Sequence, residues 1–421
     1  MTYSGTAGAR SGTGFYDSGA WWLTVPPQRR VLLMPATMAS ATRLLDIADL
    51  FHGDLRVQLH FTVPPNSFSA GTAALLAAQG VPVMPWERAK TEQFDLALSA
   101  NFGGMAEVRA PVVIFAHGAS RNSLARPRGR GAMPLTGPVN GFSRAELVHA
   151  GVLVPTGLAV GHERELDLLA AGCPEALPVA SVVGDPCYDR IVAQAGRRAA
   201  FRRALGLAAG QKLVVVTSTW RTNSLLGSSL HLIGRLVEEL PASKYRVILL
   251  THPNIWSAHG GYQLRAWLKP SAQRGLTVLR PEADWQPILT AADWIIGDHG
   301  SVTLYGAATG APILLGAFPE DDVHPDSGAA ALGRIAPKIT ANVPLDVQLA
   351  HAAADLDPEA MARVASTISS EPGAFARITR RLLYNTLALS QPSVPARLAP
   401  AQPPAALCVA QKGPRNGMAA A

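Results

Sequence analysis

The stretch WIIGDHGSVTLY, residues 294–305, decides the fold predicted for this chain. Its apolar start is typical of a buried strand, a polar turn follows, and Ser301 is predicted to be the N-cap of a short helix. Gly310 and Pro312 predict the end of that helix before a second apolar strand at 313–315. The stretch therefore predicts a strand, a turn, a helix and a second strand of a parallel sheet.

The polar turn at 298–301 lies where a ligand site is expected. Open α/β sheets bind ligands at the carboxyl ends of their strands. The free N–H groups and the dipole of a helix N-terminus also favour a phosphate there. The other interpretation is a plain strand–helix connection that binds nothing, and the stretch alone does not decide between the two.

Apolar segments alternate with helical segments on both sides of this unit. The strands predicted before it are 30–35, 57–61, 81–83, 94–99, 112–115, 179–183, 213–217, 246–250 and 275–279. The helices predicted among them are 39–51, 72–79, 164–171, 193–205, 230–240 and 285–291. Such alternation predicts parallel sheets with helices on both faces, and 421 residues suffice for two such domains.

We divide the chain into five parts on this pattern. Residues 1–28, rich in Gly, Ser and Thr, are expected to be a disordered lead, and the Pro/Ala-rich residues 392–421 a disordered tail. Residues 29–175 and 176–345 are predicted to be two Rossmann-like domains. Residues 346–391 are predicted to form helices that pack back on the body of the protein.

The composition excludes several classes of protein. Only 16% of the residues are charged, and no apolar run approaches the roughly 20 residues of a membrane span. The first residues lack the apolar core of a signal peptide, so we expect a cytoplasmic protein. Three scattered cysteines, Cys173, Cys187 and Cys408, indicate neither a disulfide framework nor a zinc site. No metal and no cofactor is predicted.

The positive charge is concentrated near the end of the chain. Of the net charge of +7, much comes from residues 372–421, which hold six basic residues and no acidic one. The body is therefore close to neutral, which argues against a nucleic-acid-binding face. The helix predicted at 373–390 alternates apolar and basic residues. It either packs on the body or lies on an anionic membrane surface, which would place the protein peripherally at the inner face of the cell membrane.

Polar residues follow several of the predicted strands. His117 follows the strand at 112–115, where its side chain could accept a proton near neutral pH, although it could also be a surface histidine in a turn. Arg121 and Arg126 lie in the next loop, which either holds an anionic substrate or is merely solvated.

The second half places further polar residues at one edge of its sheet. Thr219 and Arg221 follow the strand at 213–217, and His252 follows the strand at 246–250. Parallel strands end at a common edge, so these residues are expected to converge with the turn at 298–301. This convergence of separate loops predicts a binding site.

Five short motifs, in this order, resemble one enzyme family. They are His117-Gly118, Gly184-Asp185-Pro186 with Asp189, Thr219-Trp220-Arg221, His252-Pro253 and Asp298-His299-Gly300-Ser301. Together they resemble the CDP-glycerol glycerophosphotransferase family, whose members make teichoic-acid-like polymers from nucleotide-diphosphate donors. The resemblance covers residues 30–340 and implies the GT-B fold, with two doubly wound Rossmann-like domains facing a cleft.

The resemblance also implies roles for individual residues. The first domain would bind the acceptor and the second the donor, with His117 as the base and His252 at the donor diphosphate. The residues that would contact the donor are Thr219, Arg221, Asp298, His299, Gly300 and Ser301. Those that would contact the acceptor are Arg121 and Arg126. The implied reaction transfers a glycerophosphate or glycosyl group to a hydroxyl acceptor, in the synthesis of a cell-envelope polymer or glycan.

Two motifs depart from the family pattern. The family usually has Asp-Tyr-Ser-Ser where this chain has residues 298–301, and it continues from the first His-Gly to Thr-Pro and Lys, where this chain has Ala119-Ser120-Arg121. Both departures lie at predicted substrate contacts. Two alternatives therefore stay open: an enzyme similar to the UDP-sugar 2-epimerases, and a non-catalytic nucleotide-binding or regulatory protein of the same fold.

Overall fold

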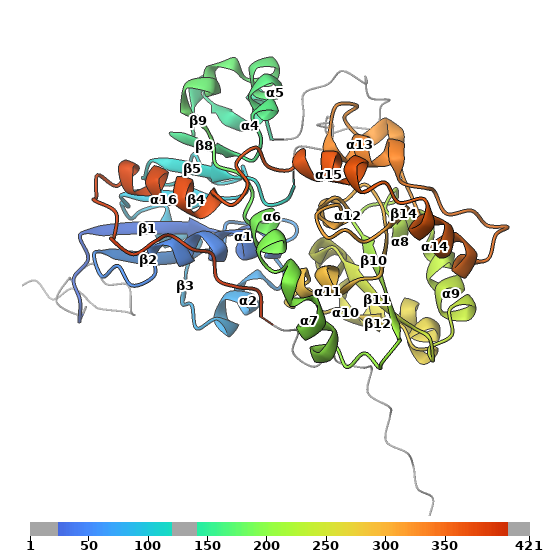
Figure 1. Ribbon diagram of the computed structural model, residues 1–421. Helices are drawn as coiled ribbons and strands as arrows, with labels where there is room; N and C mark the ends of the chain where they lie inside the picture. The colour runs from blue at the N-terminus through green and yellow to red at the C-terminus, as the bar shows by residue number, and fades with distance from the viewer. Residues whose placement is uncertain (1–23, 120–140, 403–421) are drawn as a thin grey trace, which may run out of the picture.

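The computed structural model describes residues 24–119 and 141–402, which form two α/β lobes (Figure 1). Figure 1 shows the first sheet on the left and the second on the right, with α1 (Met38–Ala48) and α6 (Pro186–Ala193) between them. Among the described residues, no helix has the length and apolar character needed to span a bilayer.

The first lobe contains a seven-stranded sheet in the order β3-β2-β1-β4-β5-β8-β9, in which every pair is parallel. The strands are β1 (Arg29–Met34), β2 (Val57–Thr62), β3 (Val83–Met84), β4 (Leu96–Ser99), β5 (Val112–Phe115), β8 (Gly157–Val160) and β9 (Ala180–Val182). The helices of this lobe are α1, α2 (Thr72–Ala78), α3 (Trp86–Ala89), α4 (Arg144–Leu147) and α5 (Arg164–Gly172). A separate antiparallel hairpin is formed by β6 (Val148–His149) and β7 (Val152–Leu153).

The second lobe contains a five-stranded parallel sheet in the order β12-β11-β10-β13-β14. Its strands are β10 (Lys212–Ser218), β11 (Tyr245–Thr251), β12 (Thr277–Val278), β13 (Trp294–Gly297) and β14 (Ile313–Leu315). Its helices are α6, α7 (Arg198–Ala204), α8 (Leu225–Ser228), α9 (Leu230–Glu239), α10 (Pro253–Gln273), α11 (Gln286–Ala291) and α12 (Ser301–Gly306). The chain ends with α13 (Gly328–Ile335), α14 (Leu345–Ala354), α15 (Pro358–Ser366) and α16 (Phe375–Thr386).

Both sheets are covered by helices on both faces. In β1, Val31 and Leu33 belong to one apolar cluster, while Leu32 and Met34 belong to another on the opposite face. The second sheet is likewise buried between two clusters. Because successive strand residues alternate between faces, burial on both sides explains the continuous apolar runs in the sequence. The prediction of two doubly wound Rossmann-like domains is confirmed.

One predicted boundary was wrong, and one long helix was missed. The boundary predicted at 175/176 assigns β9 to the second domain, whereas β9 pairs with β8 in the first sheet. Helix α10 was not predicted, because Gly260, Gly261 and Pro270 indicate breaks. In the structure Gly260 does interrupt it, with a φ of 75°, so that two helical pieces meet at a kink.

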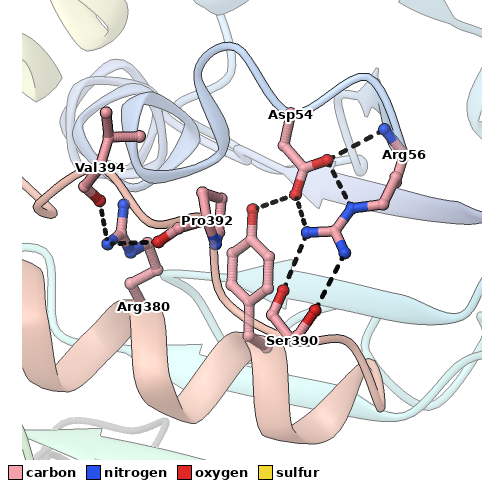
Figure 2. Close-up of polar contacts among 7 residues, drawn as sticks. Asp54, Arg56, Arg380, Ser390, Pro392 and Val394 are labelled. Atoms are coloured by element: carbon pink, nitrogen blue, oxygen red, sulfur yellow. Dashed lines mark hydrogen bonds and ion pairs between the residues drawn. The ribbon is translucent and has the colours of Figure 1, made fainter.

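The last helix returns to the first lobe, as Figure 1 shows. Its apolar side chains, among them Phe375 and Leu383, join the cluster on one face of the first sheet. Figure 2 shows the polar contacts that accompany this packing: Asp54 binds Arg56, and the Arg56 guanidinium donates to the carbonyl and hydroxyl oxygens of Ser390. The apolar face of the basic helix therefore lies on the body of the protein.

The chain after α16 runs across both lobes. The Arg380 guanidinium donates to the carbonyl of Val394 (Figure 2), Arg190 of α6 donates to that of Ala399, and Arg197 donates to that of Ala401. The disorder predicted from residue 392 onward is therefore wrong for residues 392–402, because side chains of both lobes hold their backbone. Residues 403–421 and residues 1–23 of the predicted lead lie outside the described part of the chain.

Candidate functional site

The carboxyl edges of the two sheets face each other. His117 follows β5 in the first lobe, and the turn at 298–301 follows β13 in the second. A Cβ added to Gly118 would lie 2.6 Å from the Ser301 Oγ. The two edges thus meet at Gly118, where a side chain would displace the Ser301 hydroxyl.

His117 is held by a backbone carbonyl. Its Nδ1 lies 2.8 Å from the Ala100 oxygen, which follows β4. A carbonyl oxygen only accepts hydrogen bonds, so Nδ1 carries the proton and donates it. In the neutral ring the lone pair therefore lies on Nε2, which is the tautomer that a proton-accepting base requires.

His252 is held in the opposite way. It is the N-cap of α10, and its Nδ1 accepts a hydrogen bond from the Asn254 N–H at 3.1 Å. In the neutral ring the proton is therefore on Nε2. Burial, together with the nearby His117, lowers the pKa of His252 to about 3, so the ring is neutral at physiological pH. His252 is a neutral hydrogen-bond donor.

Asp298 organises the loops around the second-lobe edge. Its buried carboxylate accepts hydrogen bonds from the backbone N–H groups of Thr219 at 2.8 Å, Leu225 at 2.9 Å and Gly300 at 2.9 Å. The pKa of this carboxyl group is raised, because the effect of burial outweighs the lowering by the adjacent His299 and by the three N–H groups. These bonds give Asp298 a role in shaping the site, and its direct contact with a donor stays a prediction.

The turn itself differs from the prediction in one respect. Gly300, not Ser301, is the N-cap of α12, and Ser301 is the first helical residue. The Asp298 carboxylate accepts the Gly300 N–H, so the chain stays extended at Gly300 (φ −74°, ψ 157°) and turns helical one residue later. The helix is also shorter than expected, since it ends at Gly306 rather than near Gly310.

Gly297, just before the turn, allows a close approach of neighbouring side chains. A Cβ there would lie 2.3 Å from the Thr303 Oγ1 and 2.4 Å from the Thr217 Oγ1. These two hydroxyls are hydrogen-bonded to each other at 2.7 Å, which links β10 to α12. No other residue type fits at this position without disrupting that link.

An aromatic row borders the same edge. The Trp220 ring lies 6.1 Å from the His252 ring and 4.8 Å from the Phe68 ring, which comes from the first lobe. The Arg221 guanidinium lies 4.4 Å from the centre of the Trp220 ring. Arg221 also has a φ of 81°, a strained value for a residue with a side chain and one that recurs at functional sites. Phe68 was not predicted as a site residue, because a lone aromatic in a polar loop gives no signal in the sequence.

Not every predicted residue lies in the described site. The structure brings together His117, Thr219, Arg221, His252 and the turn at 298–301. Arg121 and Arg126 lie outside the described residues. Within residues 24–119 and 141–402, no group of three or more His, Cys, Asp or Glu side chains could hold a metal ion.

The Gly184-Asp185-Pro186 motif lies at the junction of the lobes, where Gly184 and Asp185 line the same small cavity as Gly118. Asp185 caps α6 and forms a buried ion pair with Arg43 of α1 at 3.1 Å. The Tyr305 hydroxyl of α12 donates to the same carboxylate at 2.8 Å. Asp189 accepts the N–H groups of Gly373 and Phe375 at the start of α16. These two acidic residues therefore connect helices at the junction of the lobes.

Comparison with known proteins places the fold. No family model and no curated protein matches the sequence. Among solved structures, the chain is similar to a variant of the wall teichoic acid polymerase TagF soaked with CDPG, with a TM-score of 0.58 and 13% identity over 86% of this chain and 89% of that one. This similarity shows the fold, and the prediction of a GT-B arrangement is confirmed.

Two further solved structures are less similar. HepE from Anabaena in complex with UDP-glucose has a TM-score of 0.47 at 13% identity, over 86% of this chain and all of that one (100%). UDP-GlcNAc 2-epimerase from Neisseria meningitidis, bound to UDP-GlcNAc, has a TM-score of 0.48 at 12% identity, over 85% and 99% of the two chains. Neither similarity supports a conclusion about this chain.

Proposed function

We propose that this protein is a transferase that uses a nucleotide-diphosphate donor and a hydroxyl acceptor. The observation that carries the proposal is the pair of histidines at the meeting edges of the two sheets, one with its lone pair on Nε2 and the other with its proton on Nε2. Transfer to a hydroxyl requires these two groups: a base for the incoming O–H, and a donor of hydrogen bonds for the departing phosphate.

The acceptor hydroxyl gives its proton to Nε2 of His117 while its oxygen attacks the donor. The bond between the transferred group and the departing nucleotide phosphate breaks, and the phosphate keeps the electron pair. The Nε2–H of His252, the Arg221 guanidinium and the Ser301 hydroxyl stabilise the negative charge on that phosphate. In this scheme the first lobe binds the acceptor and the second binds the donor.

The transferred group is a glycerophosphate or a sugar, as in a CDP-glycerol-like donor or a nucleotide sugar. The sequence resemblance and the TagF-like fold with its soaked CDPG support the first. The residues proposed to contact the donor are Thr219, Arg221, Asp298, His299, Gly300 and Ser301. The acceptor contacts proposed in the loop after His117, Arg121 and Arg126, extend the same scheme.

Peripheral contact with an anionic membrane is proposed through the outer side of α16. Arg377 and Arg381 are exposed on this helix, while Arg380 is buried and engaged with residues 392–394. Such contact would bring the site close to a lipid-linked acceptor of the cell envelope.

The leaving group distinguishes the two reactions. The full-length protein is incubated with CDP-glycerol and with a set of CDP- and UDP-linked sugars, and the released nucleotide is identified by chromatography. Glycerophosphate transfer releases a nucleoside monophosphate, whereas glycosyl transfer releases a nucleoside diphosphate. Donor binding without release for every donor and acceptor would contradict the proposal and support a binding protein.

A further inference from the structure

A loop of the first lobe contacts the second lobe. It connects β2 to α2 and comprises residues 63–71, at the same carboxyl edge as His117. Asn66 orders it locally, since its Oδ1 accepts the Phe68 N–H at 2.9 Å. From the second lobe, the Ser257 Oγ of α10 donates to the carbonyl oxygens of Ala70 at 3.1 Å and Phe68 at 3.4 Å.

This loop places Phe68 against the donor side of the site. The Phe68 and Trp220 rings meet edge to face, with centroids 4.8 Å apart and planes at 66°. The Trp220 ring in turn neighbours the Arg221 guanidinium and the His252 ring. Edge-to-face pairs and cations over aromatic rings are both attractive geometries. One aromatic side chain of the acceptor lobe is thus connected, through Trp220, to two proposed donor-binding groups.

We propose that Phe68 is a positioning residue: its contact with Trp220 across the cleft fixes the loop at 219–225, and with it Arg221, when the lobes are closed. The proposal rests on the proposed function, because it states how the donor-binding groups are held in place. The strained φ of Arg221, 81°, supports it, since such a conformation persists only where the surroundings hold it.

A closed aromatic contact has a consequence for the reaction. Closure excludes water from the donor phosphate and leaves the acceptor hydroxyl as the nucleophile. Loosening the contact should slow transfer to the acceptor and raise the share of donor that is hydrolysed by water. A purely structural role for Phe68 would lower both rates together.

The test compares Phe68→Ala and Phe68→Tyr with the control Leu55→Ala, which removes a side chain that is 70% exposed at the opposite edge of the same sheet. Hydrogen–deuterium exchange of the free protein is followed in peptides covering 219–225. We expect Phe68→Ala to speed exchange there about three- to tenfold, the factor that corresponds to the free energy of one aromatic pair. Phe68→Tyr and Leu55→Ala should exchange like the wild type.

Turnover is measured on the same variants. We expect Phe68→Ala to lower kcat for transfer by about three- to tenfold and to raise the ratio of hydrolysis to transfer, with Phe68→Tyr restoring both. Unchanged exchange at 219–225 in Phe68→Ala overturns the inference, even if the wild type is an active transferase. An unchanged ratio of hydrolysis to transfer in an active Phe68→Ala variant overturns it as well. Faster exchange in a protein that turns over no donor upholds the contact and rejects the proposed function instead.

Discussion

His117 and His252 stand at corresponding places, each just after a strand at the carboxyl edge of its sheet, yet the structure holds their rings in opposite ways. The Nδ1 of His117 donates to the Ala100 carbonyl, whereas the Nδ1 of His252 accepts from the Asn254 N–H. The second nitrogen of each ring is therefore a lone pair in one case and a donor in the other. The role of each histidine is therefore set by the partner of its other nitrogen.

The pair also suggests an unusually clean mutational test. An asparagine at 117 can still donate its amide N–H to the Ala100 carbonyl, and an asparagine at 252 can still accept the Asn254 N–H, because asparagine carries both kinds of group. The same substitution thus preserves what Nδ1 does at each position and removes Nε2 at both.

The largest effect is expected from His117→Asn. Removing a general base lowers transfer about 10²- to 10⁴-fold, while donor binding, measured by calorimetry, stays near the wild-type value. The rise of kcat/KM with pH that a base produces should also disappear. If the transfer rate of His117→Asn stayed within a fewfold of the wild-type rate, His117 would not be the base, and the two histidines would not have different roles.

The next effect is expected from His252→Asn. It removes a hydrogen bond to a charged phosphate, which is worth about 1.5–3 kcal/mol, so donor affinity should fall roughly ten- to a hundredfold. The rise of kcat/KM with pH that is attributed to His117 should remain in this variant. As a control, His252→Ala should lose about 1 kcal/mol of stability through its missing cap, whereas His252→Asn keeps the cap. Equal donor affinity in His252→Asn and wild type would contradict the assignment.

Asp298→Asn should disturb only the half of the site that contains His252. The carboxylate accepts three backbone N–H groups, and an amide would direct its own NH₂ at one of them. We expect a loss of about 1–3 kcal/mol in the free energy of unfolding, measured with urea, together with weaker donor binding. If the variant lost transfer while keeping donor affinity, Asp298 would affect the acceptor half of the site, which would contradict the assignment.

The last prediction concerns stability as a function of pH. The pKa of His252 falls from an ordinary 6.5 to about 3 on folding, so the unfolded chain binds more protons between these values. Folding is therefore favoured by this residue above pH 6.5, and its contribution is lost as the pH falls toward 3. The slope for one such group is at most about 1.4 kcal/mol per pH unit. Urea unfolding at several pH values should show that the free energy of unfolding depends less steeply on pH in His252→Asn than in the wild type. Equal slopes in the two proteins would show that His252 is not the cause of the pH dependence.

The sequence predicted the arrangement of the fold well where periodicity was strong. The apolar runs of both sheets, and the strand–turn–helix around residue 300, lie close to where they were predicted. The sequence failed at α10, because Gly260, Gly261 and Pro270 predict breaks that the helix accommodates with a kink. It also failed for residues 392–402, whose Pro/Ala-rich composition indicates disorder, while arginines of both lobes hold their carbonyls.

The candidate site was predicted in part, for a similar reason. Strand ends are local features, so the sequence could place Arg221, His252 and the turn at 298–301 along the edge of the second sheet, and His117 at a strand end of the first. It could not show that Gly118 touches Ser301 or that Phe68 reaches Trp220, because these contacts join segments that are far apart in the chain.

By itself, the sequence determined which residue types stand at the ends of which strands, because the alternation of apolar and polar residues encodes strands and their limits locally. The tertiary structure alone decided what those residues can do. It set the proton positions on the two histidines, buried Asp298 among three N–H donors, and placed Ser301 inside its helix rather than at the cap. Hydrogen-bond direction and desolvation depend on neighbours in space, and the folded chain supplies those neighbours from distant segments.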